Sequence, residues 1–198
     1  MNKSTSCLLA LLIATSGVPL AQEALPFSLP VPDGWQTETI PFPLEFAPQI
    51  PYSGLEELRF SPGMFEEGAD DFWTYAFVWW VNPDDPTDAQ ALSGHLETYF
   101  RGLATAVAES RSIDASQARF SASIAAGPGH SFTGSAETVD AFVTGDQIRL
   151  NIHGQIIRCE AQARLAVFFG LSPRESDHPV WTELHSIRQG FRCGAPAS

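Results

Sequence analysis

The sequence predicts an α+β domain in which a β-sheet is covered on both faces. Residues 72–81 are rich in aromatic and β-branched side chains and are apolar on both sides of an extended strand, as in a central strand with layers above and below. Residues 88–109 carry one apolar stripe at helical spacing. Several later segments alternate apolar and polar residues, which is typical of half-buried strands.

The first residues of the chain predict export. Lys3 precedes the apolar run 8–14, and a tail of small residues follows as far as Ala21. A bilayer-spanning helix needs about 20 apolar residues, so the run is too short to be one. Cys7 precedes the run, whereas a lipoprotein cysteine follows it. We therefore expect a signal peptide over 1–21 and a periplasmic or secreted mature chain without a transmembrane segment.

Cleavage after Ala21 leaves 177 residues, enough for one domain with its own core. We expect a proline-rich extended segment over 22–52 that leads into an α+β domain over 32–198. Lys3 is the only lysine, so the mature chain has ten arginines against 23 acidic residues, a net charge of about −13. Nucleic acid and anionic membrane surfaces are not expected as partners, because both need clustered cations. Schiff-base chemistry is excluded, because the mature chain has no lysine.

The first elements are short. Strands are expected over 35–40 and 57–61, and the turn Pro62-Gly63 ends the second. The strand 72–81 follows an acidic loop, and a proline-rich turn over 82–86 ends it.

Thr87 and Gln90 predict a capping box at the start of the helix 88–109. Its apolar stripe consists of Leu92, Leu96, Tyr99, Phe100, Leu103 and Val107. Glu97 and Arg101 form an i,i+4 pair on the opposite side.

Four strands and a helix complete the domain. The strands are expected over 118–124, 131–142, 148–157 and 163–169, separated by glycine-containing or polar turns. The closing helix is expected over 177–189, with Pro179 early in it and Gly190 at its end.

Two cysteines remain after cleavage, Cys159 and Cys193. In an oxidising compartment two cysteines are most simply a disulfide, and two buried free thiols are the alternative. The closing helix must return antiparallel to the last strand, which leaves the turn at Cys159, and this return brings Cys193 back toward Cys159. We therefore predict the bridge.

Two short motifs resemble the two ends of a known fold. Residues 32–35 (Pro-Asp-Gly-Trp) precede the first strand, and residues 186–192 (Ser-Ile-Arg-Gln-Gly-Phe-Arg) close the last helix. With the order of strands and helices, they resemble the PsbP-like fold of photosystem extrinsic proteins and small periplasmic bacterial domains. The resemblance implies a twisted antiparallel sheet sandwiched between helices. Residues 56–65 also resemble uncharacterised secreted bacterial proteins, and neither resemblance carries a functional residue over.

One polar row is a candidate ligand site. Arg149, Asn151 and His153 share the polar face of the strand 148–157, because alternate residues of a strand point to the same side. The row lines a groove if a helix leaves it open. Otherwise it is a solvated sheet face.

Four other features are candidates for a catalytic or binding role, and each also has a simpler structural explanation. Residues 129–134 (Gly-His-Ser-Phe-Thr-Gly) approach a G-x-S-x-G nucleophile elbow around Ser131, but Thr133 replaces the last glycine and a strand follows. The five histidines have no i,i+3 or i,i+4 pair; they are His95, His130, His153, His178 and His185. Two acidic clusters, within 66–71 and 84–88, could bind calcium or simply start loops and a helix. Trp79-Trp80 could stack on sugars or pack in the core.

No convergent nucleophile–base set and no metal-ligand spacing is evident in the sequence. We therefore expect a non-catalytic exported module without cofactor or metal that binds an envelope component, a protein or a small ligand. The alternative is a small periplasmic hydrolase that uses histidine and acidic residues scattered along the sequence. Oligomeric state does not follow from the sequence.

Overall fold

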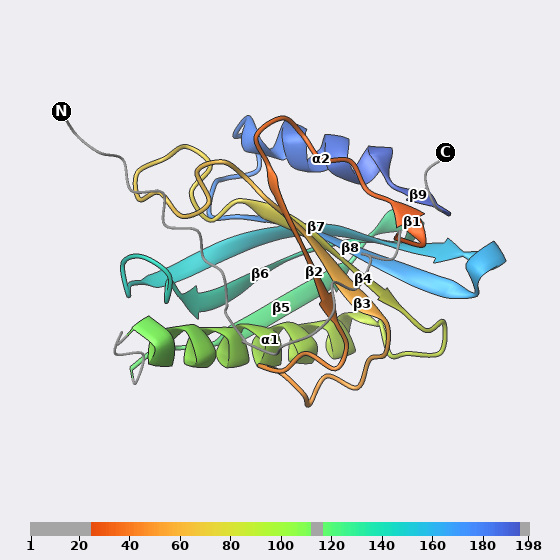
Figure 1. Cartoon of the computed structure of the whole chain (residues 1–198), viewed down its shortest axis with the longest axis horizontal. Helices are drawn as coiled ribbons and strands as arrows, with labels where there is room; N and C mark the ends of the chain where they lie inside the picture. The colour runs from red at the N-terminus through yellow and green to blue at the C-terminus, as the bar shows by residue number, and fades with distance from the viewer. Residues whose placement is uncertain (1–24, 112–116, 195–198) are drawn as a thin grey trace, which may run out of the picture.

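A seven-stranded antiparallel sheet carries one helix on each face (Figure 1). The structure is a computed structural model that describes residues 25–111 and 117–194. The expected signal peptide, 1–21, lies outside the described residues. The strand order is β2-β3-β4-β8-β7-β6-β5, and every neighbouring pair is antiparallel. The prediction of a mixed domain with a sheet covered on both faces is thus confirmed.

The boundaries agree with the expected ones to within a few residues. The sheet consists of β2 (Gln36–Pro41), β3 (Leu55–Phe60), β4 (Tyr75–Val81), β5 (Ser121–Ala126), β6 (Ser131–Val139), β7 (Gln147–Cys159) and β8 (Arg164–Ser172). The helices are α1 (Ala89–Arg111) and α2 (Val180–Gly190). Two short 3₁₀ turns, Pro128–His130 and Glu160–Gln162, precede β6 and β8.

The strand β4 is buried along its whole length, as its two-sided apolar pattern predicts. Trp79 belongs to the core between the sheet and α1, and Trp80 belongs to the core on the α2 face. Adjacent strand residues point to opposite faces, so one aromatic pair contributes to both cores. Neither ring is available to stack on a sugar at the surface.

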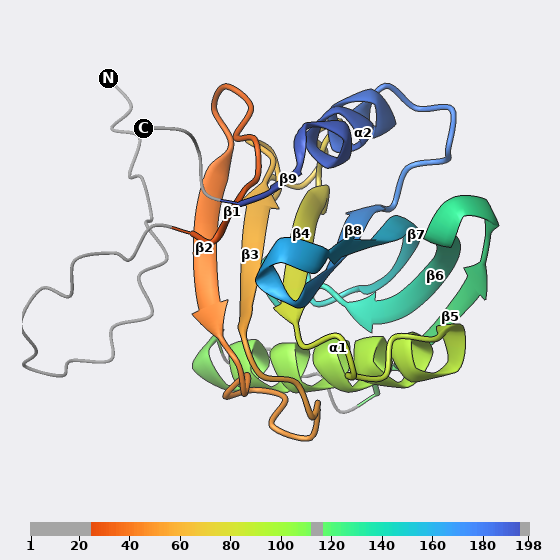
Figure 2. The ribbon, with the colours of Figure 1, turned by 90° about the vertical axis from the view of Figure 1, so that its right-hand side faces the viewer.

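The helix α1 covers one face of the sheet (Figure 2). The first four residues of the predicted stripe are buried, whereas further along Ala104 and Ala108 are buried and Leu103 and Val107 are only half-buried. Its cap differs from the predicted one. The carboxylate of Asp88 accepts hydrogen bonds from the backbone N–H groups of Gln90 and Ala91, at 2.9 and 3.0 Å. Asp88 is thus the N-cap, and the Thr87–Gln90 capping box was wrong by one residue. The predicted Glu97–Arg101 pair is present, at 2.8 Å.

The helix α2 packs on β8 and β4 on the opposite face. It begins at Val180, three residues later than predicted, because residues 173–179 form a connecting loop. Gly190 is its last residue. A Cβ atom there would lie 2.3 Å from Cγ of Pro30, so the glycine is required by the close approach of the N-terminal segment.

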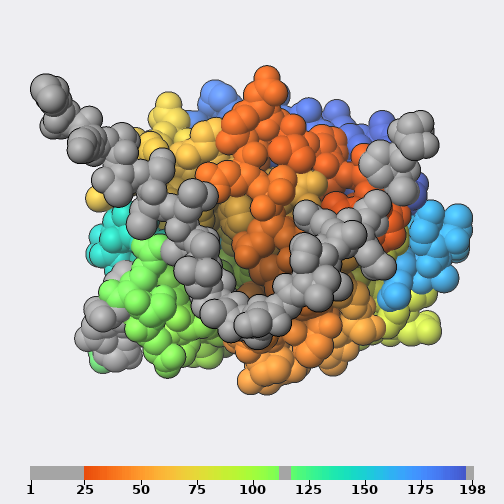
Figure 3. Space-filling view, in the orientation of Figure 1, coloured from red at the N-terminus to blue at the C-terminus, as the bar shows by residue number. Residues whose placement is uncertain are grey.

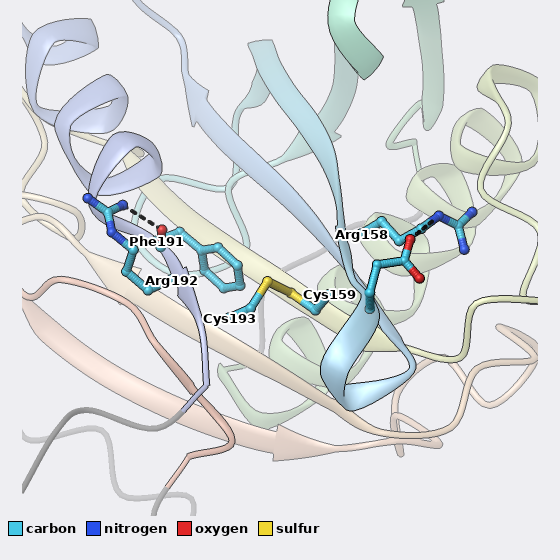
Figure 4. Close-up of a disulfide and its surroundings, with 6 residues drawn as sticks. Arg158, Cys159, Phe191, Arg192 and Cys193 are labelled. Carbon is cyan, nitrogen blue, oxygen red and sulfur yellow. Dashed lines mark hydrogen bonds and ion pairs between the residues drawn. A yellow bond between two sulfur atoms is a disulfide. The ribbon is translucent and has the colours of Figure 1, made fainter.

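A disulfide joins Cys159, at the end of β7, to Cys193, with a Cα–Cα distance of 5.5 Å (Figure 4). Cys193 belongs to β9 (Arg192–Cys193), which pairs with β1 (Phe27–Ser28). This two-stranded sheet was not predicted, because β1 lies among prolines and each strand has two residues. The predicted cysteine pairing is confirmed.

The N-terminal segment lies across the edge of the sheet and is visible in red and orange in Figure 3. Phe27 and Leu29 are buried in the core under α2, and Phe42 and Leu44 are buried in the core on the α1 side. The segment therefore contributes to both cores although its prolines prevent a regular helix.

One acidic residue, Glu56 on β3, lies fully buried in the core on the α1 side. Burial raises the pKa of its carboxyl group to about 8, even though Trp79 Nε1 donates a hydrogen bond to it at 3.0 Å. The side chain is therefore protonated in the folded protein at neutral pH.

Glu56→Gln should remove a pH dependence of stability. Between pH 4.5 and about 8 the folded chain keeps a proton that the unfolded chain has lost, so the free energy of unfolding falls as the pH rises through that window. Glutamine remains uncharged, so the variant should lack this loss, which for the wild type at pH 8 is roughly 4 kcal/mol for a shift from 4.5 to about 8. Urea unfolding at pH 5 and pH 8 measures this, with the exposed Glu97→Gln as control. Parallel pH profiles for wild type and Glu56→Gln would contradict it.

Candidate functional site

The face of the sheet on which α2 packs changes from apolar to polar between α2 and the edge strand β5. Under α2 it is apolar, with Val78, Trp80 and Phe168 in the core. Figure 2 shows α2 above β4 and β8, whereas β6 and β5 lie to one side of the helix. The face of β5, β6 and β7 beyond α2 carries polar side chains.

Strand register builds this polar face. Ser123, Ser135 and Asn151 are cross-strand neighbours on β5, β6 and β7, and Thr133 lies opposite His153 in the adjacent row. Side chains directly opposite one another in a sheet share a face, so the alternation on three strands combines into one polar surface. The predicted row Arg149, Asn151, His153 forms its β7 side.

This surface is concave. A hollow of about 390 Å³ lies over it, and the loop between β8 and α2 contributes one wall. Its lining residues are Ser123, Ala125, Thr133, Gly134, Ser135, Arg149, Asn151, Ile152, His153 and Ser176. The structure thus brings the three predicted residues together in one open hollow that α2 leaves uncovered.

His153 is held by contacts from three directions. Its ring stacks on Trp181 of α2, with centroids 4.1 Å apart and planes at 27°. Its Nδ1 lies 3.3 Å from Nε2 of His185, also on α2, and its Nε2 lies 3.3 Å from the hydroxyl oxygen of Ser176.

Both histidines are neutral at pH 7. Partial burial, followed by the neighbouring His185 and Arg188, lowers the pKa of His153 below its usual 6.5. Partial burial and Arg188 lower the pKa of His185 in the same direction. A neutral imidazole has one donor and one acceptor nitrogen, so each ring can accept a hydrogen bond on one side and donate one on the other.

Arg149 supplies positive charge to the hollow. Its side chain is 62% exposed, and its guanidinium lies 3.6 Å from the carboxylate of Glu137 on β6. Such an exposed pair contributes little to stability, so the guanidinium can turn toward a ligand at small cost. Among the ten described lining residues, Arg149 is the one that is charged at pH 7, and Glu137 lies beside it.

Asn151 and Trp181 fix the loop that carries Ser176. Asn151 Nδ2 and Trp181 Nε1 both donate to the carbonyl oxygen of Arg174, at 3.1 and 3.2 Å. The Arg174 guanidinium in turn donates to the carbonyl oxygens of Ala69 and Asp70, at 2.9 and 2.8 Å. The wall of the hollow is therefore tied to β7, to α2 and to the loop before β4.

The other histidines lie elsewhere. His95 on α1 is 2.9 Å from the hydroxyl of Tyr52, which donates to the carbonyl of Pro86 at 2.7 Å, so His95 Nδ1 is the donor of that pair. His178 precedes α2 and accepts from the backbone N–H of Val180. His130 ends the short 3₁₀ turn before β6.

Two further candidates do not form sites. Ser131 begins β6 and donates to the carbonyl of Pro128 at 2.6 Å, so it occupies a strand start and not a nucleophile elbow. Asp85 and Asp88 accept backbone N–H groups in the turn before α1. Within residues 25–111 and 117–194, no group of three or more His, Cys, Asp or Glu side chains is arranged to hold a metal ion.

Sequence reasoning missed Ser176, Trp181 and His185 as companions of His153. They lie in the loop after β8 and on α2, and only the packing of α2 on the sheet brings them to β7. The available indication was an aromatic–histidine pair, Trp181 and His185, at i,i+4 on one helix face.

A comparison with protein-family models, with curated proteins and with solved structures finds no match to this chain. Across the described part of the chain, no helix has the length and apolar character needed to cross a membrane.

Proposed function

We propose that this chain is an exported binding module that takes a small anionic ligand into the hollow over β5, β6 and β7. The observation that carries the proposal is the combination of shape and chemistry in one place. The hollow holds one arginine, one asparagine and several hydroxyl groups, while the chain as a whole has a net charge of −12. A local cation in an acidic protein favours a small anion over an extended polyanion.

The lining matches a carboxylate or phosphate group in particular. The guanidinium of Arg149 presents paired N–H donors to two oxygens, and Thr133, Ser123 and Ser135 add hydroxyl donors from neighbouring strands. Neutral His153 adds an uncharged wall beside them. Donors on strands are positioned by the sheet, so little order is lost when a ligand binds.

Export is part of the proposal. The N-terminal pattern around Lys3 and residues 8–14 is typical of a signal peptide, and the Cys159–Cys193 disulfide suits an oxidising compartment. The antiparallel sheet between two helices also supports the proposed likeness to the PsbP-like fold of periplasmic domains.

Arg149→Gln should weaken anion binding by about tenfold, the equivalent of one charge-assisted hydrogen bond of ~1.4 kcal/mol. Succinate and inorganic phosphate are the probes, titrated by calorimetry at low salt. Arg158→Gln is the matched control, since Arg158 is 57% exposed, pairs with Glu160 at 3.7 Å and does not line the hollow.

Weakening by Arg149→Gln but not by Arg158→Gln supports the proposal. Equal effects of the two variants, or no binding of either probe to the wild type, would refute it.

A further inference from the structure

Three side chains from separate elements form a hydrogen-bonded line at one side of the hollow. Ser176 lies on the β8–α2 loop, His153 on β7 and His185 on α2. The Ser176 Oγ–His153 Nε2 and His153 Nδ1–His185 Nε2 distances are both 3.3 Å. A hydroxyl, a base and a group that orients the base, in that order, are the parts of an activated serine.

The donors and acceptors of the line fit one consistent arrangement. If the Ser176 hydroxyl donates to Nε2 of His153, that ring carries its proton on Nδ1 and donates it to Nε2 of His185. Both rings are then neutral, which agrees with the lowered pKa values of the two histidines. No buried charge is needed to hold the arrangement.

The geometry is fixed by groups outside the line. The Trp181 ring stacks on His153 and holds its plane. The carbonyl of Arg174 accepts from both Asn151 and Trp181, so the loop that carries Ser176 is anchored two residues before the serine. Ser176 itself is exposed and faces the hollow as one of its lining residues.

We propose that Ser176 is a nucleophile activated by His153, that His185 is a positioning residue, and that the hollow hydrolyses carboxylic esters whose acyl part carries an anionic group. This inference rests on the proposed function, because the anion site supplies the binding of the acyl part. The alternative expected from the sequence was a hydrolase that uses scattered histidine and acidic residues, whereas this inference uses one serine and two histidines.

The chemistry needs no co-reactant other than water. The Ser176 proton passes to Nε2 of His153 as the Oγ–carbon bond forms, and the leaving alcohol takes this proton when its carbon–oxygen bond breaks. A water molecule then gives a proton to the same nitrogen and attacks the acyl carbon. The Oγ–carbon bond breaks, Oγ regains its proton and the carboxylic acid leaves. Arg149 lies in the same hollow and binds the anionic group of the acyl part.

Hydrolysis of mono(4-nitrophenyl) succinate tests the inference, with neutral 4-nitrophenyl acetate as the comparison ester. The wild type should prefer the anionic ester, and Ser176→Ala should lower kcat/KM for it by at least ~100-fold. The control is Ser186→Ala, an exposed serine on α2. A fluorophosphonate should add one adduct per chain at Ser176, located by mass spectrometry.

His185 needs a readout that a structural role would not change. His185→Gln keeps an acceptor for His153 Nδ1 and should retain most activity, whereas His185→Phe should lose at least ~10-fold in kcat with little change in KM. The charged and titratable groups next to His153 are His185 and Arg188 of α2. The loop that carries Ser176 adds Glu175 and Asp177, and the Arg149–Glu137 pair lies further along the same face of the sheet. The wild-type rate should rise with pH and then level off, with a midpoint below the usual 6.5 of histidine, because burial lowers the pKa of His153.

Succinate binding separates the two proposals. If the wild type binds succinate and turns the ester over, and Ser176→Ala loses the turnover and the adduct, both stand. If the wild type binds succinate but shows neither turnover nor an adduct at Ser176, the catalytic inference is refuted and the binding function stands. If succinate does not bind to the wild type, the proposed function is refuted, and the catalytic inference that rests on it is refuted as well.

Discussion

Arg59→Met should lower the free energy of unfolding by about 3–5 kcal/mol, because it leaves a buried carboxylate without its partner. The side chains of Arg59 and Glu57 are only 3% and 4% exposed and form an ion pair on the outer face of β3. Arg59 also donates to the carbonyl oxygens of Leu29 and Pro30, at 2.9 and 3.0 Å. The Thr39 hydroxyl donates to the second oxygen of Glu57.

This pair fastens the N-terminal segment to the sheet. Removal of Arg59 therefore frees the carbonyl groups of residues 29–30 as well as the charge of Glu57, and β1 should open with them. Chemical denaturation measures the loss, and limited proteolysis should cut near residues 29–30 first.

Two further variants separate the buried charge from the packing. Glu57→Gln/Arg59→Met should recover part of the stability, since no unpaired charge remains. Arg101→Met is the matched exposed control: it breaks the Glu97 pair, in which Arg101 is 55% exposed, and should cost less than about 1 kcal/mol. A loss for Arg59→Met no larger than for Arg101→Met would contradict the account.

Cys159→Ser/Cys193→Ser should lower stability by about 3–4 kcal/mol, the chain-entropy value for a closed loop of this length. The bridge spans 34 residues and encloses β8 and α2. Cys159 is also fully buried in the core under α2, so a serine hydroxyl there adds a desolvation cost.

Reduction of the wild type provides the control for this double variant. The reduced wild type keeps both sulfur atoms in place, so its loss of stability reports the cross-link alone and should be slightly smaller than that of the double serine variant. Equal stability of the oxidised and reduced wild type would show that the bridge does not constrain the unfolded chain.

The elements were predictable where local pattern and packing agree. The apolar residues on both sides of β4 predicted a central strand, and the apolar stripe at 3.6-residue spacing predicted α1. Each pattern can bury its apolar side chains in only one type of secondary structure. The pairing of β1 with β9 was not predictable, since two-residue strands have no periodicity and are held by long-range contacts. The start of α2 was missed because Pro179 is compatible with several positions in the first turn.

The candidate site was predictable only in part, because its residues are also brought together by long-range contacts. Alternation along one strand placed Arg149, Asn151 and His153 on a common face, and the structure places them in one hollow. The register of β5 and β6 and the position of α2 decide what lies opposite them. Ser176 and His185 reach His153 from 23 and 32 residues away in sequence, and no local pattern records such a distance.

The hollow over β5, β6 and β7 is the proposed binding site for a small anion. The most direct test is a ¹H–¹⁵N NMR titration of the mature protein with succinate at low salt. We expect saturable shifts confined to amides that line the hollow, such as those of Thr133, Asn151 and His153, with the α1 face unchanged. Shifts spread over unrelated arginines, or no saturable shift in the hollow, would contradict it.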